Sequence, residues 1–301
     1  MATYSIVARD ASGTLGAAVQ SHWFNVGAVV PWVEAGVGAV AVQSIPDPTH
    51  GPRALALLRE GLDPGDALGR LLEGDPEAAY RQLGIVDAAG RAAAHTGALC
   101  IAEAGHVTGQ GVAVQANLMN RATVWPAMLR AYEGAEADLA ERLLAALEAA
   151  EAEGGDVRGR QSAAIIVRPP AGRDDPTFDL RVEDHPDPIG ELRRLVLLGR
   201  AYHELNRGDG LIAAGDVGAA SAAYARATAL VPDEATGGEA PFWAGVALAG
   251  AGRREDALPY LRRAAAVDGR WARLLPRLVR SRLLPDDPAL LEELARAMGA
   301  A

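Results

Sequence analysis

Residues 3–20 read TYSIVARDASGTLGAAVQ and set the architecture of the first part of the chain. Two mostly apolar runs, 3–9 and 14–20, flank the segment Asp10-Ala11-Ser12-Gly13, whose Asp and Gly are typical of hairpin turns. Neither run alternates regularly between polar and apolar residues, and residues 1–50 hold only four formal charges. Strands of this kind are covered on both faces. The stretch therefore predicts an antiparallel hairpin inside a layered domain.

Further apolar and β-branched runs follow, and helical patterns separate them. We expect strands at residues 36–44, 82–87, 91–95, 109–115, 162–167 and 177–182. We expect helices at residues 52–60, 64–72, 127–132 and 139–150. Two of these helices begin at proline, and the last repeats leucine at Leu139, Leu143 and Leu147. Strands, helices and strands again predict a layered α+β domain that ends near residue 185.

The pattern changes after Ile189, beyond which almost every signal is helical. Two segments have the spacing of a tetratricopeptide repeat: Gly215, Ala220, Tyr224, Ala227 and Pro232, then Trp243, Val246, Ala247, Gly252, Ala257, Leu261 and Ala264. Ala220 and Ala257 are 37 residues apart, close to the usual repeat length of about 34. A generic alanine-rich helical bundle is the alternative. We expect two domains, residues 1–187 and a small all-α repeat domain at residues 188–301.

The composition of the chain limits which binding partners and which cellular compartment are expected. The net charge of −10 disfavours nucleic acid, because an acidic protein repels phosphate backbones. Residues 1–10 do not resemble a signal peptide, and no apolar run has membrane-spanning length, so no membrane partner is expected. The one cysteine, Cys100, excludes an internal disulfide and is interpreted as a small buried hydrophobic residue. These features together favour the cytoplasm.

The first domain resembles a known family through several blocks in order. They are residues 5–10 (SIVARD), 35–41 (AGVGAVA), 80–83 (YRQL) with Val86-Asp87, 95–97 (HTG), 115–119 (QANLM), 158–163 (RGRQSA) and 184–188 (DHPDP). These blocks are similar to the bacterial domain-of-unknown-function family 1028, which is described as N-terminal-nucleophile (Ntn) hydrolase-like. The resemblance implies a four-layer αββα sandwich. It does not imply an established reaction.

The resemblance also points to Thr3 as the nucleophile. In an Ntn hydrolase the first residue of the mature chain attacks an amide carbonyl, and its own α-amine, with a pKa of about 7.7–8.0, is the base. Family members commonly begin Met-Thr, whereas this chain has Ala2 between Met1 and Thr3. Thr3 therefore becomes an N-terminal nucleophile only if Ala2 is also removed or the true start is Thr3. The alternative is that Thr3 is a β-branched strand residue.

Other candidate residues follow the expected strands. Asn117, near Gln115, ends a strand where a side-chain amide can stabilise an oxyanion, although asparagine is also a common turn residue. The expected substrate-binding residues are Arg9, Ser21, His22, Gln43, His95 and Arg160. The arginines suit a substrate anion. An ion pair or turn cap at Arg9, a packed rim histidine at His22 and a solvated loop at Arg160 are the alternatives.

No metal and no cofactor are expected. His50, His95 and His106 follow no recognised ligand spacing, and the glycine-rich residues 105–111 lack a nucleotide-binding context. The sequence therefore favours an amidohydrolase that cleaves a small linear or cyclic amide through Thr3. The alternative is a non-catalytic binding or assembly protein, whose helical tail holds a peptide or protein partner. A homodimer is compatible with both functions.

Overall fold

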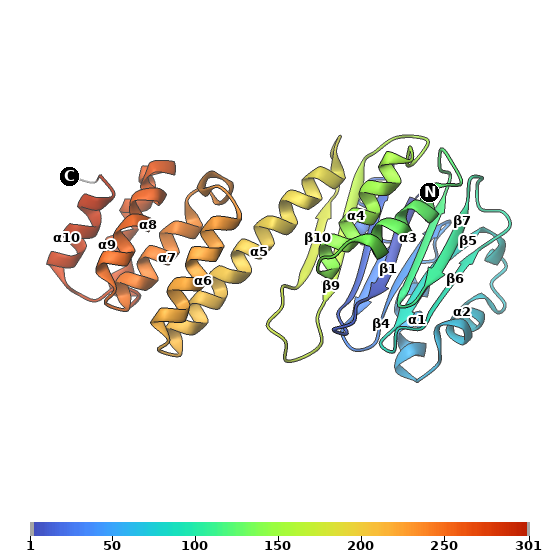
Figure 1. The fold of residues 1–301 in the computed structure, drawn as a ribbon, viewed down its shortest axis with the longest axis horizontal. Helices are drawn as coiled ribbons and strands as arrows, with labels where there is room; N and C mark the ends of the chain where they lie inside the picture. Colours follow the sequence, from blue (N-terminus) through green and yellow to red (C-terminus); the bar gives the residue numbers. More distant parts are fainter. Residues whose placement is uncertain (1–2, 300–301) are drawn as a thin grey trace. The chain divides into compact units, whose positions relative to one another are not determined.

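The computed structural model describes residues 3–299 and divides the chain into two compact units, Met1–Val196 and Leu197–Ala301 (Figure 1). The sequence placed the boundary at 187/188. The first unit extends further because helix α5 (Pro188–Ala213) begins with Ile189, Leu192 and Val196, which are buried in the core of that unit. The remainder of α5 belongs to the helical unit.

The first unit contains a six-stranded antiparallel sheet with the order β10-β9-β2-β1-β8-β7. Its strands are β1 (Thr3–Arg9), β2 (Leu15–Ser21), β7 (Gly105–Gly109), β8 (Val112–Asn117), β9 (Ser162–Arg168) and β10 (Phe178–Val182). The predicted hairpin is present: β1 has the predicted bounds, and β2 begins and ends one residue later than the predicted strand at residues 14–20. The hairpin lies at the centre of the sheet, as its uniformly buried residues require.

A second antiparallel sheet has the order β3-β4-β5-β6. Its strands are β3 (Pro31–Glu34), β4 (Gly38–Ser44), β5 (Arg81–Asp87) and β6 (Ala92–Thr96). The two sheets face each other, with β1 contacting β4 and β5, and β5 contacting β8. The mixed α+β class expected from the sequence is confirmed.

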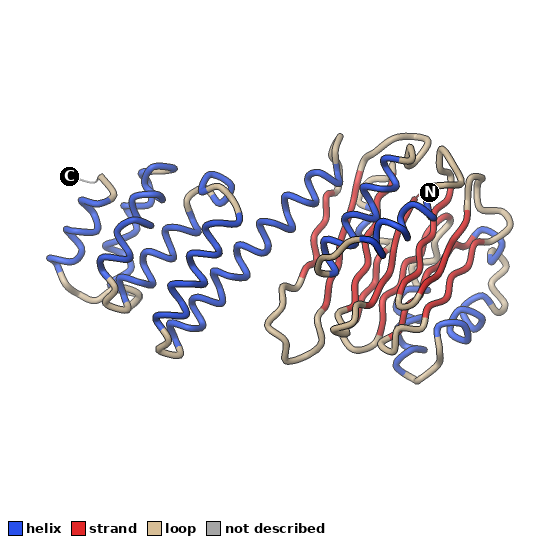
Figure 2. The backbone as a smooth tube through the Cα atoms, in the orientation of Figure 1, coloured by secondary structure: helices blue, strands red, loops and turns tan. Residues whose placement is uncertain are grey.

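Two helices cover the outer face of each sheet (Figure 2). Helices α3 (Val124–Gly134) and α4 (Leu139–Ala152) pack on the six-stranded sheet, and α1 (His50–Arg59) and α2 (Pro64–Leu72) on the four-stranded sheet. Short 3-10 helices lie at Val26–Ala28 and Ala78–Tyr80. The side chains of Asp63 and Asp138 cap the amino ends of α2 and α4, which satisfies backbone N–H groups that have no partner within the helix.

Strand β1 shows how the core is divided between layers. Because side chains alternate across a strand, Tyr4, Ile6 and Ala8 face α3 and α4, while Val7 faces the second sheet. Small apolar side chains fill much of the space between the sheets, namely Val7, Ala17, Val19, Ala39, Ala41, Val86, Ala113 and Ala164. Toward the start of β1, the same layer becomes polar.

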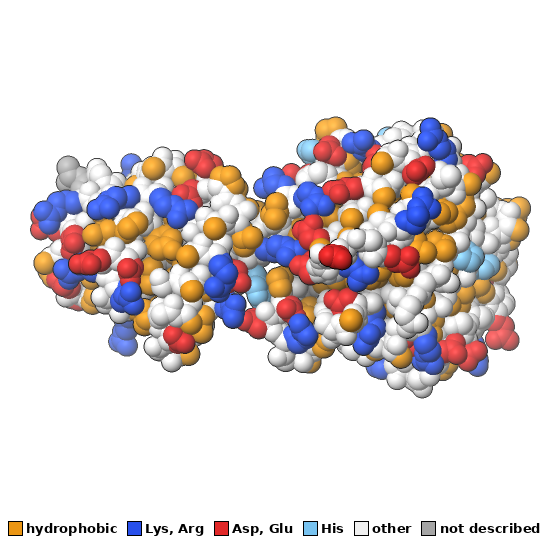
Figure 3. Space-filling view, in the orientation of Figure 1, with side chains coloured by type: hydrophobic (Ala, Val, Ile, Leu, Met, Phe, Trp, Pro, Cys, Tyr) orange, Lys and Arg blue, Asp and Glu red, His pale blue; other side chains and the backbone are white. Residues whose placement is uncertain are grey.

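The second unit is all-helical within residues 197–299. Besides the end of α5, it contains α6 (Val217–Leu230), α7 (Glu239–Gly250), α8 (Arg254–Val267), α9 (Leu275–Arg280) and α10 (Pro288–Ala297), with 3-10 helices at Asp233–Thr236 and Gly269–Leu274. On its visible face, apolar side chains lie among arginine and acidic side chains (Figure 3). No helix within residues 3–299 combines the length and apolar composition needed to cross a membrane.

In two helix pairs of this unit, a glycine of one helix packs closely against a large side chain of the next helix. A Cβ added at Gly208 in α5 would lie 2.3 Å from the ring of Tyr224 in α6. A Cβ added at Gly245 in α7 would lie 2.7 Å from Leu261 in α8. Both members of the second pair follow those of the first by 37 residues, the interval that separates Ala220 from Ala257. The two helix pairs therefore make matching close contacts at the interval that the sequence pattern predicted.

Candidate functional site

Thr3 is the first residue of β1 and lies between the two sheets. Its side chain is fully buried, and Oγ1 donates a hydrogen bond to Oγ of Ser21, 3.2 Å away on β2. On the other side of β1, Thr3 is the register partner of Asn117 in β8, so the two side chains stand next to each other on one face of the sheet. The structure thus brings together the two residues expected to be catalytic.

Two amides from the second sheet reach this position. Nε2 of Gln43 donates to the backbone oxygen of Thr3 at 3.1 Å and to Oε1 of Gln82 at 2.8 Å. Nδ2 of Asn117 donates to the same Oε1 of Gln82 at 2.8 Å. Gln82 therefore links β4, on the second sheet, to the end of β8, on the first, at the position of Thr3.

Ser5 and Gln115 extend the network along β1. Oγ of Ser5 donates to Oε1 of Gln43 at 2.6 Å and accepts from Nε2 of Gln115 at 2.6 Å. Oε1 of Gln115 is buried and has no hydrogen-bond partner within residues 3–299. Gly84 makes room for this amide, because a Cβ at Gly84 would lie 2.0 Å from Oε1 of Gln115.

We call this network the amide cluster: Thr3, Ser5, Ser21, Gln43, Gln82, Gln115 and Asn117, each at most 1% exposed. None of these side chains ionises near neutral pH, so the amide cluster can orient a carbonyl or an amide but supplies no side-chain base. A threonine hydroxyl needs a base to become a nucleophile. The α-amine of a chain that starts at Thr3 is such a base, whereas Met1 and Ala2 lie outside the described residues.

A surface cavity of about 660 Å³ lies beside the amide cluster. Thr96 lines this cavity and also bonds to Gln82 of the amide cluster. Oγ1 of Thr96 accepts from Nε2 of Gln82 at 2.9 Å and lies 2.9 Å from Nδ1 of His106, another lining residue. Desolvation of the ring, followed by the nearby His95, lowers the pKa of His106 and favours its neutral form, in which Nδ1 pairs with Thr96 as donor or acceptor according to the tautomer. Gln82 thus connects the cavity wall to Thr3.

Cys100 also lines this cavity. Its thiol lies 3.4 Å from the backbone oxygen of Arg81, and the residue is only half-buried. The interpretation of Cys100 as a fully buried hydrophobic residue was wrong, because residues 97–104 form a surface loop rather than a strand.

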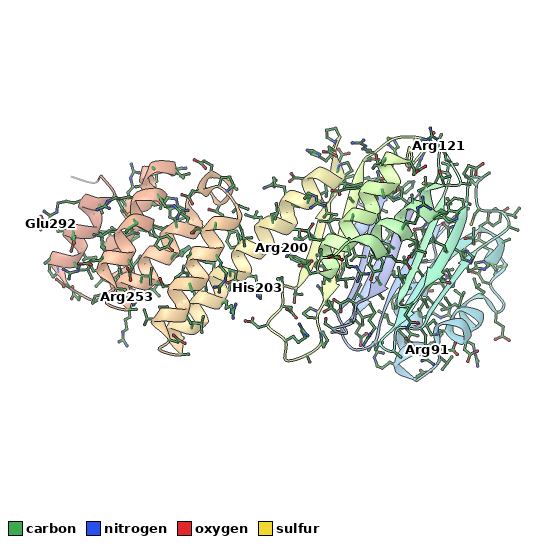
Figure 4. All side chains as sticks on the ribbon, in the orientation of Figure 1. Arg91, Arg121, Arg200, His203, Arg253 and Glu292 are labelled. Atoms are coloured by element: carbon green, nitrogen blue, oxygen red, sulfur yellow. The ribbon has the colours of Figure 1, made fainter. Side chains whose placement is uncertain are left out.

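Two of the expected binding residues join the amide cluster, and four do not. Ser21 and Gln43 contact Thr3 directly. Arg9 lies at the opposite end of β1 and donates to the backbone oxygen of Asp10, as the turn-cap alternative proposed. Figure 4 shows the two ends of the sheets, with Arg121, which follows β8, at one end and Arg91, between β5 and β6, at the other.

The remaining three residues lie outside the amide cluster. A ring nitrogen of His22 lies 3.2 Å from the backbone oxygen of Arg160. The Arg160 guanidinium forms ion pairs with Glu151 and Asp187. The ring of His95 contacts the backbone oxygen of Ala78.

Sequence reasoning did not single out Ser5, Gln82 or Thr96. The available signal was the spacing of two in Thr3/Ser5 and Gln115/Asn117, which places polar side chains on one face of otherwise apolar strands. Within the described part of the chain, no three His, Cys, Asp or Glu side chains are grouped to hold a metal ion.

Comparisons with known proteins agree with this architecture. No curated protein matches the chain. Among solved structures, it is similar to the crystal structure of protein SPO2555 from Silicibacter pomeroyi, for which the family is given as DUF1028. The identity is 35%, the TM-score is 0.60, and the match covers 65% of this chain and 88% of that chain. The family model described as "Family of unknown function (DUF1028)" matches residues 3–192. Since this match spans more than half of the sequence, the chain belongs to the DUF1028 family.

Proposed function

We propose that the first unit is an Ntn-type amidohydrolase with the four-layer αββα sandwich of that class, and that Thr3 cleaves a small amide or cyclic amide. The observation that carries the proposal is the position of Thr3 as the first residue of a central strand, facing a buried cluster of neutral amides. A hydroxyl in such surroundings lacks a side-chain base. The amine of a chain starting at Thr3 would supply one.

In the proposed reaction, Oγ1 of Thr3 attacks the substrate carbonyl carbon while the α-amine takes the hydroxyl proton. The C–N bond then breaks, the leaving amine receives that proton, and an ester to Thr3 remains. Water hydrolyses this ester and releases the carboxylic acid. Nδ2 of Asn117 has two N–H groups and one acceptor within residues 3–299, Oε1 of Gln82, so the second N–H is left for the oxyanion.

The assignment of Arg160 to a substrate anion requires an exchange of partners. Its guanidinium is held by Glu151 and Asp187, and Glu151 also accepts from the hydroxyl of Tyr4. A substrate carboxylate would have to displace one of these acidic side chains. We therefore propose substrate binding first for Ser21 and Gln43, which contact Thr3 directly.

The experiment compares two chains that differ only at the amino terminus. One begins at Thr3, released by a protease that leaves no extra residue, and the other begins at Ala2. Each is treated with a β-lactone that acylates N-terminal threonine nucleophiles, and the adduct is located by intact and tandem mass spectrometry. We expect a single ester adduct on the side chain of Thr3 in the chain that begins at Thr3, and none on Thr3 in the longer chain.

Two variants serve as controls. Thr3→Val keeps the shape of the side chain without its hydroxyl and should abolish the adduct. Thr14→Val removes the hydroxyl of another largely buried threonine, at 7% exposure, and should leave it unchanged. Adducts that persist in Thr3→Val, or equal reaction of the two chains, would exclude Thr3 as the N-terminal nucleophile.

A second function, partner binding by tetratricopeptide-like helices in residues 197–301, is supported by two features of that unit. One is the repeated contact at Gly208 and Gly245, and the other is a cavity of about 620 Å³ lined by Trp243. We expect Trp243 fluorescence of the full chain to change on binding of a partner peptide, and Thr3→Val to leave that change intact. Loss of the change in Thr3→Val would assign the peptide to the first unit.

A further inference from the structure

Arginine is distributed unevenly along the chain. All 29 cationic side chains counted as Lys or Arg are arginines, and the whole chain carries a net charge of −10. Residues 253–282 depart from this balance, with nine arginines against three acidic residues, a surplus of six positive charges. This stretch covers α8, the 3-10 helix Gly269–Leu274, α9 and the turn that follows.

Four of the nine arginines are paired with carboxylates. Arg253 pairs with Asp256, Arg254 with Glu293, Arg263 with Asp233 and Arg270 with Asp268. The other five are exposed, and their side chains make no hydrogen bond or ion pair within residues 3–299. We call them the arginine face: Arg262, Arg273, Arg277, Arg280 and Arg282. On the visible side of this unit, Figure 3 shows both arginine and acidic side chains around the apolar ones.

Helical spacing holds part of the arginine face together. Arg273, Arg277 and Arg280 follow one another at intervals of four and three residues, which places them on one side of the helical segment. Leu275 and Leu278 are buried in the core of the unit, on the opposite side. The guanidinium groups therefore project from the helices, with the apolar side of the same segment anchored beneath them.

Arg282 joins this face to the cavity. It ends α9 with a left-handed backbone, φ 58°, at a position where glycine is usual, and its N–H donates to the backbone oxygen of Val279. The cavity of about 620 Å³ is lined by Arg282, by Asp209, whose Oδ1 accepts from the hydroxyl of Tyr224, and mostly by apolar residues, among them Ile212, Val217, Trp243, Val246 and Leu283. Leu283 remains 50% exposed at its edge. An apolar hollow thus opens beside a row of cations.

We propose that the arginine face and this cavity bind an acidic polypeptide segment with one aliphatic anchor residue. The inference rests on the binding role proposed for the helical unit and names its ligand. Guanidinium groups form paired hydrogen bonds with carboxylates, and an aliphatic cavity buries one leucine-sized side chain. A nucleic acid fits less well, because the cavity offers one aromatic ring among aliphatic side chains, and the acidic remainder of the chain repels a long polyanion.

The experiment measures fluorescence anisotropy of a labelled peptide titrated with the full chain. The probe has one leucine with five glutamates on either side. Two comparison peptides differ from it only in having serine in place of leucine or lysines in place of the glutamates. The variant R277E/R280E/R282E reverses three charges of the arginine face. The control R53E/R121E/R130E reverses three exposed, unpaired arginines of the first unit and changes the net charge equally. Circular dichroism verifies that both variants fold.

We expect the wild type and the control to bind the leucine probe equally, and R277E/R280E/R282E to bind it at least about tenfold more weakly. The serine probe should also bind about tenfold more weakly, since burial of one aliphatic side chain is worth at least that factor. Equal affinity for the leucine and serine probes, equal loss in both variants, or tighter binding of a single-stranded oligonucleotide would overturn the proposal. If only the lysine peptide binds, the acidic ligand is refuted but the binding role of the helical unit is retained. If no peptide binds, both the acidic ligand and the binding role are refuted.

Discussion

Replacement of Gly84 by alanine tests whether the amide cluster is as tightly packed as its hydrogen bonds indicate. Gly84 lies on β5, opposite Gln115 on the facing sheet, and the added Cβ would lie 2.0 Å from Oε1 and 2.6 Å from the amide carbon. Gln115 cannot swing away without loss, because its Nε2 donates to Oγ of Ser5 at 2.6 Å. Gly84 has no positive φ, so alanine is allowed there by the backbone.

The free energy of the substitution has three contributions. Overpacking a core costs about 1–3 kcal/mol, and the lost hydrogen bond between Gln115 and Ser5 costs about 1 kcal/mol. Alanine in place of glycine in a strand returns about 0.5–1 kcal/mol through the lower entropy of the unfolded chain. We therefore expect Gly84→Ala to destabilise the first unit by about 1–3 kcal/mol. If Gln115→Ala is made first, the clash disappears and the added cost of Gly84→Ala should fall below about 0.5 kcal/mol.

Amide hydrogen exchange, followed by mass spectrometry, measures this effect within the first unit alone. Peptides from β1 and β5 should exchange about five- to 150-fold faster in Gly84→Ala than in the wild type. The exchange rates of Gln115→Ala and the double variant should be nearly equal. Gly69→Ala is the matched control, since nothing lies within 4 Å of a Cβ at that helical glycine. The reasoning is refuted if Gly84→Ala exchanges like the wild type or if Gln115→Ala leaves its cost unchanged.

Two further predictions concern the stability contributed by helices that pack on the sheets, at His50 in α1 and at the N-cap of α4. Burial lowers the pKa of His50 below its usual 6.5, against the opposing effects of Asp47 and Asp75, so the stability it contributes is complete above about pH 6.5 and is lost as the pH falls. His50→Gln should therefore lose less melting temperature between pH 7 and pH 5 than the wild type, and an equal loss would contradict the assignment. Asp138→Ala should remove the N-cap of α4 and cost about 1 kcal/mol, or about 2–4 °C in melting temperature, whereas Asp138→Asn keeps an acceptor and should cost less than half of this.

Sequence patterns predicted the long, uniform elements well. The strand at residues 3–9 and the helix at residues 64–72 have the predicted bounds, because hydrophobic periodicity and proline at the first helical turn mark them clearly. β3 and β7 were not predicted. β3 has four residues and begins at Pro31, and β7 lies between glycines at Gly105 and Gly109, so both take their conformation from pairing with β4 and β8.

The candidate site was predicted only where one strand contained the signal. Thr3 was predicted from the family resemblance and Asn117 from its position at a strand end, and the register between β1 and β8 brings them together. The role of Gln82 was not accessible, because it depends on the stacking of two sheets, and no local pattern specifies which side chain of one sheet meets which of the other. Arg160 and His22 were predicted to bind substrate because arginine and histidine are common in functional sites. In the structure, ion pairs hold Arg160, and a backbone contact holds His22.

The polar part of the inter-sheet layer is not required for the sheets to pack. Along the same strands, Val7, Ala17 and Ala113 fill that layer with apolar side chains and leave no polar atom to satisfy. A few residues away, Oε1 of Gln115 in the amide cluster has no partner among residues 3–299, and a buried acceptor in this state costs about 1–3 kcal/mol. Polar groups buried in a core are characteristic of functional sites when the same strand shows that apolar side chains could fill the same layer. This contrast within β1 is why we assign function to the end of the strand that holds Thr3 rather than to the end that holds Arg9.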